Sequence, residues 1–365
     1  MAKFCEKFMP PMLTSNEDYI NKNYEKALTD VFVEIDYLLI NEEGHEKMQE
    51  VLLELKREVR GPTAKLDMAE IREIKSIPFA AGCTSCVCLI TPDTIYCANS
   101  GDSRAILVNK AGKVTELSHD HKPDDAGELK RIKADGGFVE DGRVQGIIAV
   151  SRALGDWEYK NPDLLQQQMA KSPMKKKSLK AASTPSPTPK TGPYRNIEEA
   201  KKHQVSSYPD IKRVPIKADH DFIVLACDGI WDCYTNEQAA KYVRTKREKG
   251  PKSGMTVSMA NTPAGKAKLN AKIGGSRSSG IGSSPLKISK TKSETAKKTK
   301  IKGDISFIIE EMMDHGIAKG DITMSDGTGT DNMTCIIIQF RDESDVSKDE
   351  STAAESGYEK EEYKR

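Results

Sequence analysis

The sequence lacks the long apolar stretches that insertion into a membrane requires. No segment approaches the ~20 consecutive apolar residues of a transmembrane helix. The N-terminal segment MAKFCEKFMPPML also contains no uninterrupted apolar core of signal-peptide length. We therefore expect a soluble, cytoplasmic protein, with the nucleus as an alternative compartment.

Hydrophobic residues are scarce, and the cysteines form no regular framework. Hydrophobic residues make up 37% of the 365 residues, which indicates that part of the chain does not pack into a core. The eight cysteines lack the even spacing of a small disulfide-rich domain, and most lie in apolar runs. Cys83 and Cys86 have CxxC spacing, but no second pair stands nearby, so we interpret this run as a strand, with a zinc module as the alternative.

The net charge of +1 hides an uneven distribution of charge. Residues 164–197 contain seven Lys or Arg and no acidic residue. Residues 244–303 contain sixteen Lys or Arg and two acidic residues. The rest of the chain carries 33 basic and 53 acidic residues. Because both basic segments are rich in Lys, Ser, Pro or Gly, we expect two disordered inserts in one acidic domain of residues 1–340, followed by an acidic tail, 341–365.

Periodic patterns predict a mixed α/β domain. Apolar residues at helical spacing predict an amphipathic helix over residues 23–40, and short β-rich runs separated by turn residues begin at Cys83. Further helices are expected at 48–60, 129–136, 235–244 and 304–320, and Thr235 with Gln238 is expected to cap the third of them. Strands are expected at 83–90, 94–100, 147–150, 222–227 and 333–340, and residues 105–117 should form a hairpin that turns at Gly112. Ordered segments lie on both sides of each insert, and neither half closes a core alone, so we expect a single domain.

Four acidic residues lie where a β-rich run meets a glycine-containing turn. They are Asp102 in NSGDSRAILV, Asp228 and Asp232 in ACDGIWD, and Asp331 in GTDNMTCIII. A carboxylate at the end of the apolar run FIVLAC would be costly to bury without a positive partner. Carboxylates that converge from several strand ends suit Mg²⁺ or Mn²⁺, and two such ions can activate water for attack on phosphorus. For each motif taken alone, a simple turn is the alternative.

Six segments occur in the order seen in metal-dependent type 2C serine/threonine protein phosphatases, the PPM family, which the chain therefore resembles. They are YCANSGDSRAILV, LSHDHKPDD with LKRIKADGGFV, GRVQGIIAVSRALGDWEYK, YPDI, FIVLACDGIWD and GTDNMT. The resemblance implies an α/β sandwich of two antiparallel sheets flanked by helices, with two or more Mg²⁺ or Mn²⁺ ions where strands end. It assigns Asp228 and Asp331 to the catalytic metals, and Asp102 and Asp232 to a further, weaker metal. The implied activity is hydrolysis of phosphoserine and phosphothreonine by a metal-activated water.

The upstream part of the family pattern is not found in the sequence. The family carries there an Arg that grips phosphate, a Glu-Asp pair, and an Asp-Gly-His-Gly-Gly segment with a metal-bridging Asp and a candidate general acid, His. MAKFCEKFMPPML resembles the helix that follows that segment, and His45, expected in a polar region between helices, is no substitute. Their loss should cost orders of magnitude in rate. Two interpretations stay open: an incomplete gene model of an active enzyme, or an inactive relative that binds phosphoproteins or another partner.

The remaining polar features receive structural interpretations. His119 and His121 match the family's DHKP loop, which favours a structural role over metal binding, and Arg152 is expected to form an ion pair of the scaffold. The inserts hold Ser-Pro or Thr-Pro sites at 172, 184, 186, 188, 262 and 284. Phosphorylation by proline-directed kinases would reduce their charge, although they could equally be plain spacers. We expect a monomer that acts on phosphoproteins. Nucleic-acid binding is not expected, because Tyr194 is the one aromatic residue in the two inserts.

Overall fold

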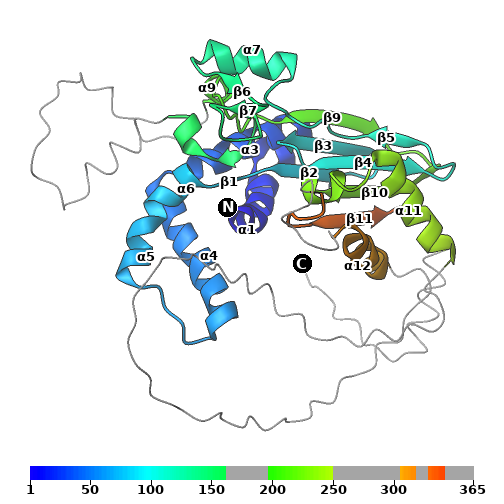
Figure 1. Ribbon diagram of the computed structural model, residues 1–365, viewed down its shortest axis with the longest axis horizontal. Coiled ribbons are helices and arrows are strands. Elements are labelled where there is room, and N and C mark those ends of the chain that lie inside the picture. The colour runs from blue at the N-terminus through cyan, green and yellow to red at the C-terminus, as the bar shows by residue number, and fades with distance from the viewer. Residues whose placement is uncertain (162–195, 250–304, 318–327, 342–365) are drawn as a thin grey trace, which may run out of the picture.

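The computed structural model describes residues 1–161, 196–249, 305–317 and 328–341 (Figure 1). Two antiparallel sheets are stacked in these residues, and helices cover the outer sides of the stack. The predicted Ser-Pro and Thr-Pro sites and the predicted acidic tail beyond residue 341 lie outside the described residues.

The larger sheet is built from strands that are distant in the sequence. Its order is β11–β10–β4–β5, and all neighbouring strands are antiparallel. Its strands are β4 (Arg104–Asn109), β5 (Val114–Glu116), β10 (His220–Ala226) and β11 (Cys335–Gln339). This sheet therefore pairs strands from three parts of the chain. Strands β4 and β5 come before the first predicted insert, β10 lies between the two inserts, and β11 follows the second.

The smaller sheet has the order β2–β3–β9 and is also antiparallel. Its strands are β2 (Ser85–Ile90), β3 (Thr94–Ser100) and β9 (Asp210–Pro215). Two short pairs accompany it: β1 (Gly82–Cys83) with β8 (Leu154–Gly155), and β6 (Val139–Glu140) with β7 (Arg143–Val144).

The side chains of β3 explain how the layers pack. Successive side chains of a strand point to opposite faces of its sheet. Ile95 and Cys97 join a buried cluster with residues of β4 and β10 between the two sheets. Tyr96 and Ala98 face the other way and join the core formed with the N-terminal helices. The predicted sandwich of two antiparallel sheets flanked by helices is confirmed.

The N-terminal helices cover the outer face of the smaller sheet (Figure 1). They are α1 (Ala2–Ser15), α2 (Glu17–Ile20), α3 (Tyr24–Leu38), α4 (Glu42–Arg60), α5 (Met68–Glu73), the 3₁₀ turn η1 (Ile74–Ser76) and α6 (Ile77–Ala80). The predicted amphipathic helix is α3, which buries Val31, Phe32 and Ile35. The expected place of His45 was wrong: it is buried in the first turns of α4 rather than in a polar region between helices.

Helices α11 (Asn236–Lys249) and α12 (Ile305–Gly316) cover the outer face of the larger sheet. Thr235 and Gln238 form the predicted reciprocal cap of α11, with hydrogen bonds of 3.2 and 2.8 Å. The predicted start of the second insert at residue 244 was wrong, because α11 continues through its basic residues. Lys246 and Arg247 form ion pairs of 2.8 and 2.7 Å with Glu311 and Asp221.

Short elements complete the described fold: α7 (Ala126–Ala134), η2 (Trp157–Tyr159), α9 (Ile197–Ala200) and α10 (Asp228–Trp231). The predicted strand at 147–150 was wrong, since only Ile148 forms an isolated bridge, to Val144. The glycines at 142 and 146, both with positive φ, turn the chain here instead. No helix among the described residues is long and apolar enough to cross a membrane.

Candidate metal centre

Asp102 and Asp228 lie at the same end of the larger sheet. Asp102 comes two residues before β4, Asp228 comes two residues after β10, and the register pairs Arg104 with Ala226 at this end. Asp102 is 4% exposed, and Asp228 is partly buried. The antiparallel register thus brings together two acids that are far apart in the sequence.

Asp331 reaches the same end of the sheet through the turn before β11. Strand β11 pairs with β10 so that Cys335 lies opposite Ala226, and the Cys227 amide donates to the Thr334 carbonyl oxygen at 3.2 Å. A Cβ atom at Gly229 would lie 2.3 Å from the Asn332 carbonyl oxygen. Glycine is therefore required for the turn that carries Asp228 to touch the turn that carries Asp331.

Three of the predicted acids lie close enough to the fourth, Asp228, to repel its charge. Asp232 follows directly after the short helix α10, which begins at Asp228, and is exposed. Burial raises the pKa of Asp228 above its ordinary value, and the negative charges of the other three acids raise it further, in the order Asp102, Asp331, Asp232. A nearby cation would relieve this repulsion.

These residues fit a hard divalent cation in donor chemistry and charge, but their side chains do not form a finished coordination shell. Within the described ranges, no three His, Cys, Asp or Glu side chains lie close enough together to hold a metal ion. Mg²⁺ prefers oxygen ligands and usually keeps several waters. The structure brings the predicted acids to one place, and their role as ligands stays a prediction.

Lys122 places an ammonium group among these acids. Its Nζ donates to Asp102 Oδ2 at 2.5 Å. Burial lowers the pKa of Lys122, but the hydrogen bond and charge of Asp102, with the charges of Asp120 and Asp228, raise it overall. We did not predict Lys122 from the sequence, where the only signal was its place in LSHDHKPDD.

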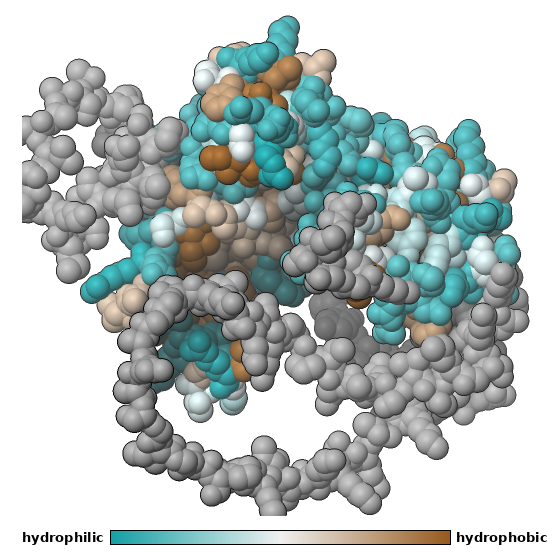
Figure 2. All heavy atoms as spheres, viewed as in Figure 1, coloured by the Kyte–Doolittle hydropathy of each residue, from teal (hydrophilic) through white to brown (hydrophobic). Residues whose placement is uncertain are grey.

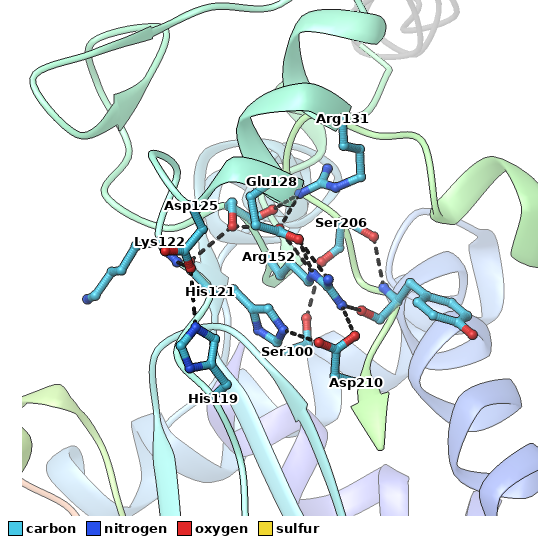
Figure 3. Close-up of polar contacts among 12 residues, drawn as sticks. Ser100, His119, His121, Lys122, Asp125, Glu128, Arg131, Arg152, Ser206 and Asp210 are labelled. Carbon is cyan, nitrogen blue, oxygen red and sulfur yellow. Dashed lines mark hydrogen bonds and ion pairs between the residues drawn. The ribbon is translucent and has the colours of Figure 1, made fainter. Parts of the chain in front are cut away.

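A network of polar contacts supports the loop that carries Asp102 (Figure 3). The Gly101 amide, next to Asp102, donates to His121 Nδ1 at 3.2 Å, and His121 Nε2 lies 3.1 Å from Asp210 Oδ2. Arg152 donates to Asp210 Oδ1 at 2.8 Å. The predicted structural role of His121 is therefore confirmed by its contacts.

Arg152 also forms the scaffold ion pair that we predicted. Its Nη2 lies 2.7 Å from Glu128 Oε1, and Glu128 also pairs with Arg131 at 2.6 Å. Burial alone would raise the pKa of Glu128, but Arg152 and Arg131 lower it to about 2. His119 lies at the exposed edge of this network: its Nε2 is 3.5 Å from Asp125 Oδ2, which accepts from the Lys122 amide (Figure 3).

The cysteines of the CxxC run form no pair with each other. Cys83 Sγ lies 3.9 Å from Cys5 Sγ, and Cys86 Sγ lies 3.8 Å from Cys97 Sγ. Cys83 ends β1 and Cys86 lies in β2, so the interpretation as strand residues is confirmed.

Comparisons with known proteins find a matching family and several relatives. The family model described as "Protein phosphatase 2C" matches residues 1–268. "Probable protein phosphatase 2C 6" of Paramecium tetraurelia is 29% identical over 341 residues, which cover 93% of this chain and 79% of the relative. "Protein phosphatase 2C homolog 2" of Schizosaccharomyces pombe is 32% identical over 245 residues, 67% of this chain and 49% of the relative. A solved serine-threonine phosphatase 2C from Toxoplasma gondii has 17% identity and a TM-score of 0.36, with coverage of 67% of this chain and 70% of that one.

The chain belongs to the protein phosphatase 2C family. By homology it is a serine/threonine protein phosphatase, a hydrolase. The family match includes Asp102, Asp228 and Asp232, whereas Asp331 lies beyond its last matched residue.

Proposed function

We propose that the protein hydrolyses phosphoserine and phosphothreonine in other proteins with two or more Mg²⁺ or Mn²⁺ ions held by Asp228, Asp331, Asp102 and Asp232. The main support is the strand register, which brings the turns of Asp102, Asp228 and Asp331 to one end of the larger sheet. Burial, and then the charges of the other three acids, raise the pKa of Asp228 accordingly. Such a concentration of like charge on partly buried groups is destabilising unless a cation binds.

The residues of the site would hold the ions by fixing the direction of their carboxylates. The Gly229 amide donates to Asp228 Oδ1 at 3.0 Å, and the Asn332 amide donates to Asp331 Oδ1 at 2.6 Å. Each bond fixes one oxygen atom of its carboxylate. The chemistry that Mg²⁺ or Mn²⁺ supplies is activation of water and neutralisation of phosphate charge.

Phosphate release from phosphoserine and phosphothreonine peptides tests the proposal. The full chain is assayed with Mn²⁺, with Mg²⁺ and with EDTA, beside Asp228→Asn, Asp331→Asn and the exposed control Asp124→Asn. We expect release to require metal and to fall about 100-fold or more in the first two variants, with the control unchanged. Release that persists in EDTA would contradict the proposal.

Binding of phosphoproteins without hydrolysis is the second candidate. It is favoured by the absence, within the described residues, of three His, Cys, Asp or Glu side chains close enough together to hold a metal ion. Retention of a phosphopeptide on the immobilised chain, with no metal-dependent release of phosphate, would support this function instead of catalysis.

A further inference from the structure

The position of Lys122 gives it a specific relation to the acids of the candidate metal centre. Its ammonium nitrogen is 2.5 Å from Asp102 Oδ2, while the Asp102 side chain is only 6% exposed. An almost buried carboxylate requires a positive partner, and in this structure Lys122 supplies it.

The backbone at Lys122 is held against the loop that carries Asp102. The His121 amide donates to the Gly101 carbonyl oxygen at 3.0 Å, and both the amide and the hydroxyl of Ser151 donate to the His121 carbonyl oxygen, at 3.2 and 3.0 Å. The root of the lysine side chain is thereby fixed next to its acid. The pairing is therefore anchored in the fold and is more than a chance contact of a surface side chain.

The ammonium end of Lys122 is freer than its root. The side chain is 43% exposed, so it can leave Asp102 for water at moderate cost, as long lysine side chains do. An incoming metal ion and the ammonium group would compete for the same carboxylate, because each neutralises the same charge.

We propose that Lys122 is a tethered counter-ion that competes with the metal ion at Asp102 and sets the affinity of that weaker site. The inference rests on the proposed function, since it assumes that Asp102 is a metal ligand. In the part of the chain that the structure describes, neither Asp228 nor Asp331 forms an ion pair with a Lys or Arg side chain, so the competition should be confined to the site that includes Asp102.

Mn²⁺ binding to the full chain tests the inference without any assay of activity. Titration is followed by calorimetry and by electron paramagnetic resonance for the wild type, Lys122→Met and Lys130→Met. Lys130 is exposed on α7, so its variant removes the same charge elsewhere. We expect the weakest Mn²⁺ dissociation constant to fall about fivefold to tenfold in Lys122→Met and to stay unchanged in Lys130→Met.

A double-mutant comparison isolates the contact between Lys122 and Asp102. In an Asp102→Asn background, Lys122→Met should no longer change Mn²⁺ affinity, because the shared carboxylate is gone. Melting curves guard against misfolding: with EDTA, Lys122→Met should melt below the wild type, and Mn²⁺ should raise its melting temperature by more than it raises that of the wild type. Lys122→Gln serves as a second variant if the methionine protein does not fold.

The outcomes separate this inference from the proposed function. If the wild type binds Mn²⁺ and both Lys122 variants bind it equally or more weakly, the counter-ion role is wrong while the metal centre stands. If neither the wild type nor any Lys122 variant binds Mn²⁺ at millimolar concentration, the metal centre and the counter-ion role both fail. Binding by Lys122→Met alone would support complete competition.

Discussion

The carboxylate of Asp36 and the ammonium of Lys160 form an ion pair of 2.7 Å in which the side chains are 1% and 0% exposed. The Gly155 amide donates to the other Asp36 oxygen at 2.7 Å, and Lys160 also donates to the Ala153 carbonyl oxygen at 2.9 Å. The pair therefore ties α3 to the segment SRALGDWEYK inside the core.

Loss of one partner of this pair should strongly destabilise the folded protein. Lys160→Met leaves Asp36 buried without a cation, and we expect it to lower the free energy of unfolding by about 3–5 kcal/mol. The double variant Asp36→Asn with Lys160→Met should recover part of that loss, because no charge is left unpaired. Urea unfolding measures both, and Lys3→Met, which removes a fully exposed pair with Glu6, is the control expected to show no measurable change. Equal losses in the single and double variants would argue against an uncompensated charge as the cause.

Gly229→Ala should disturb the candidate metal centre through sterics alone. The new methyl group would meet the Asn332 carbonyl oxygen, so the two acid-bearing turns must separate, at a cost of about 1–3 kcal/mol. We expect weaker Mn²⁺ binding together with a lower melting temperature. Gly127→Ala is the matched control, since a Cβ atom there meets nothing within 4 Å. Unchanged Mn²⁺ affinity in Gly229→Ala would show that contact between the turns is not needed.

Asp228→Asn should stabilise the protein without metal and weaken its stabilisation by Mn²⁺. Because the neighbouring acids and burial raise the pKa of Asp228, its charged form is unfavourable in the folded protein without metal. In EDTA at neutral pH the variant should therefore melt at a higher temperature than the wild type, whereas with Mn²⁺ the order should reverse. Differential scanning calorimetry reports both, and Asp124→Asn should follow the wild type. A lower melting temperature of Asp228→Asn in EDTA would contradict mutual repulsion of the acids.

His203 should make stability depend on pH. Burial, followed by the charges of Lys160 and Arg131, lowers its pKa to about 4, below about 6.5 in an unfolded chain. The stability that neutral His203 contributes is fully present above about pH 6.5 and is lost as the pH falls toward 4. The free energy of unfolding of the wild type should thus fall across this window by on the order of 2 kcal/mol more than that of His203→Gln.

Two features make that comparison specific. Burial raises the pKa of Asp156 to about 6, so Asp156 contributes stability at low pH that is lost as the pH rises through 6. Because both the wild type and His203→Gln contain Asp156, its contribution cancels when their free energies of unfolding are subtracted. The exposed His119 offers a control, because His119→Gln should reproduce the wild-type curve. If the free energies of unfolding of the wild type and His203→Gln change with pH in parallel, His203 is not the cause of the pH dependence.

The main helices and strands could be predicted from the sequence because their signals are local, whereas the sandwich was implied only by the resemblance to type 2C phosphatases. The apolar stripe of α3, the glycine turn at 112 and the cap at Thr235 each depend on residues within a few positions. The end of α11 was misjudged because its last turns are polar in composition. They are held by Glu311 and Asp221, which belong to segments distant in the sequence.

The candidate site could be predicted only as separate acids. The sequence predicted a glycine-containing turn at Asp228, but the group that Gly229 approaches, the Asn332 carbonyl, depends on the pairing of β10 with β11. Lys122 was missed for the same reason, since nothing near it in the sequence indicates that it meets Asp102. Apart from the corrected start of the second insert, the domain boundaries, the monomeric state and the role of the inserts stay predictions.

The central place of β10, between β4 and β11, has a consequence for handling the protein. Five residue pairs join β10 to β11, and α12 adds apolar contacts to α11 and the sheet. A protease that cuts the backbone once between residues 250 and 304 would therefore leave two polypeptides held by a strand ladder and a shared core. We expect the two pieces to copurify under native conditions and to separate only on denaturation.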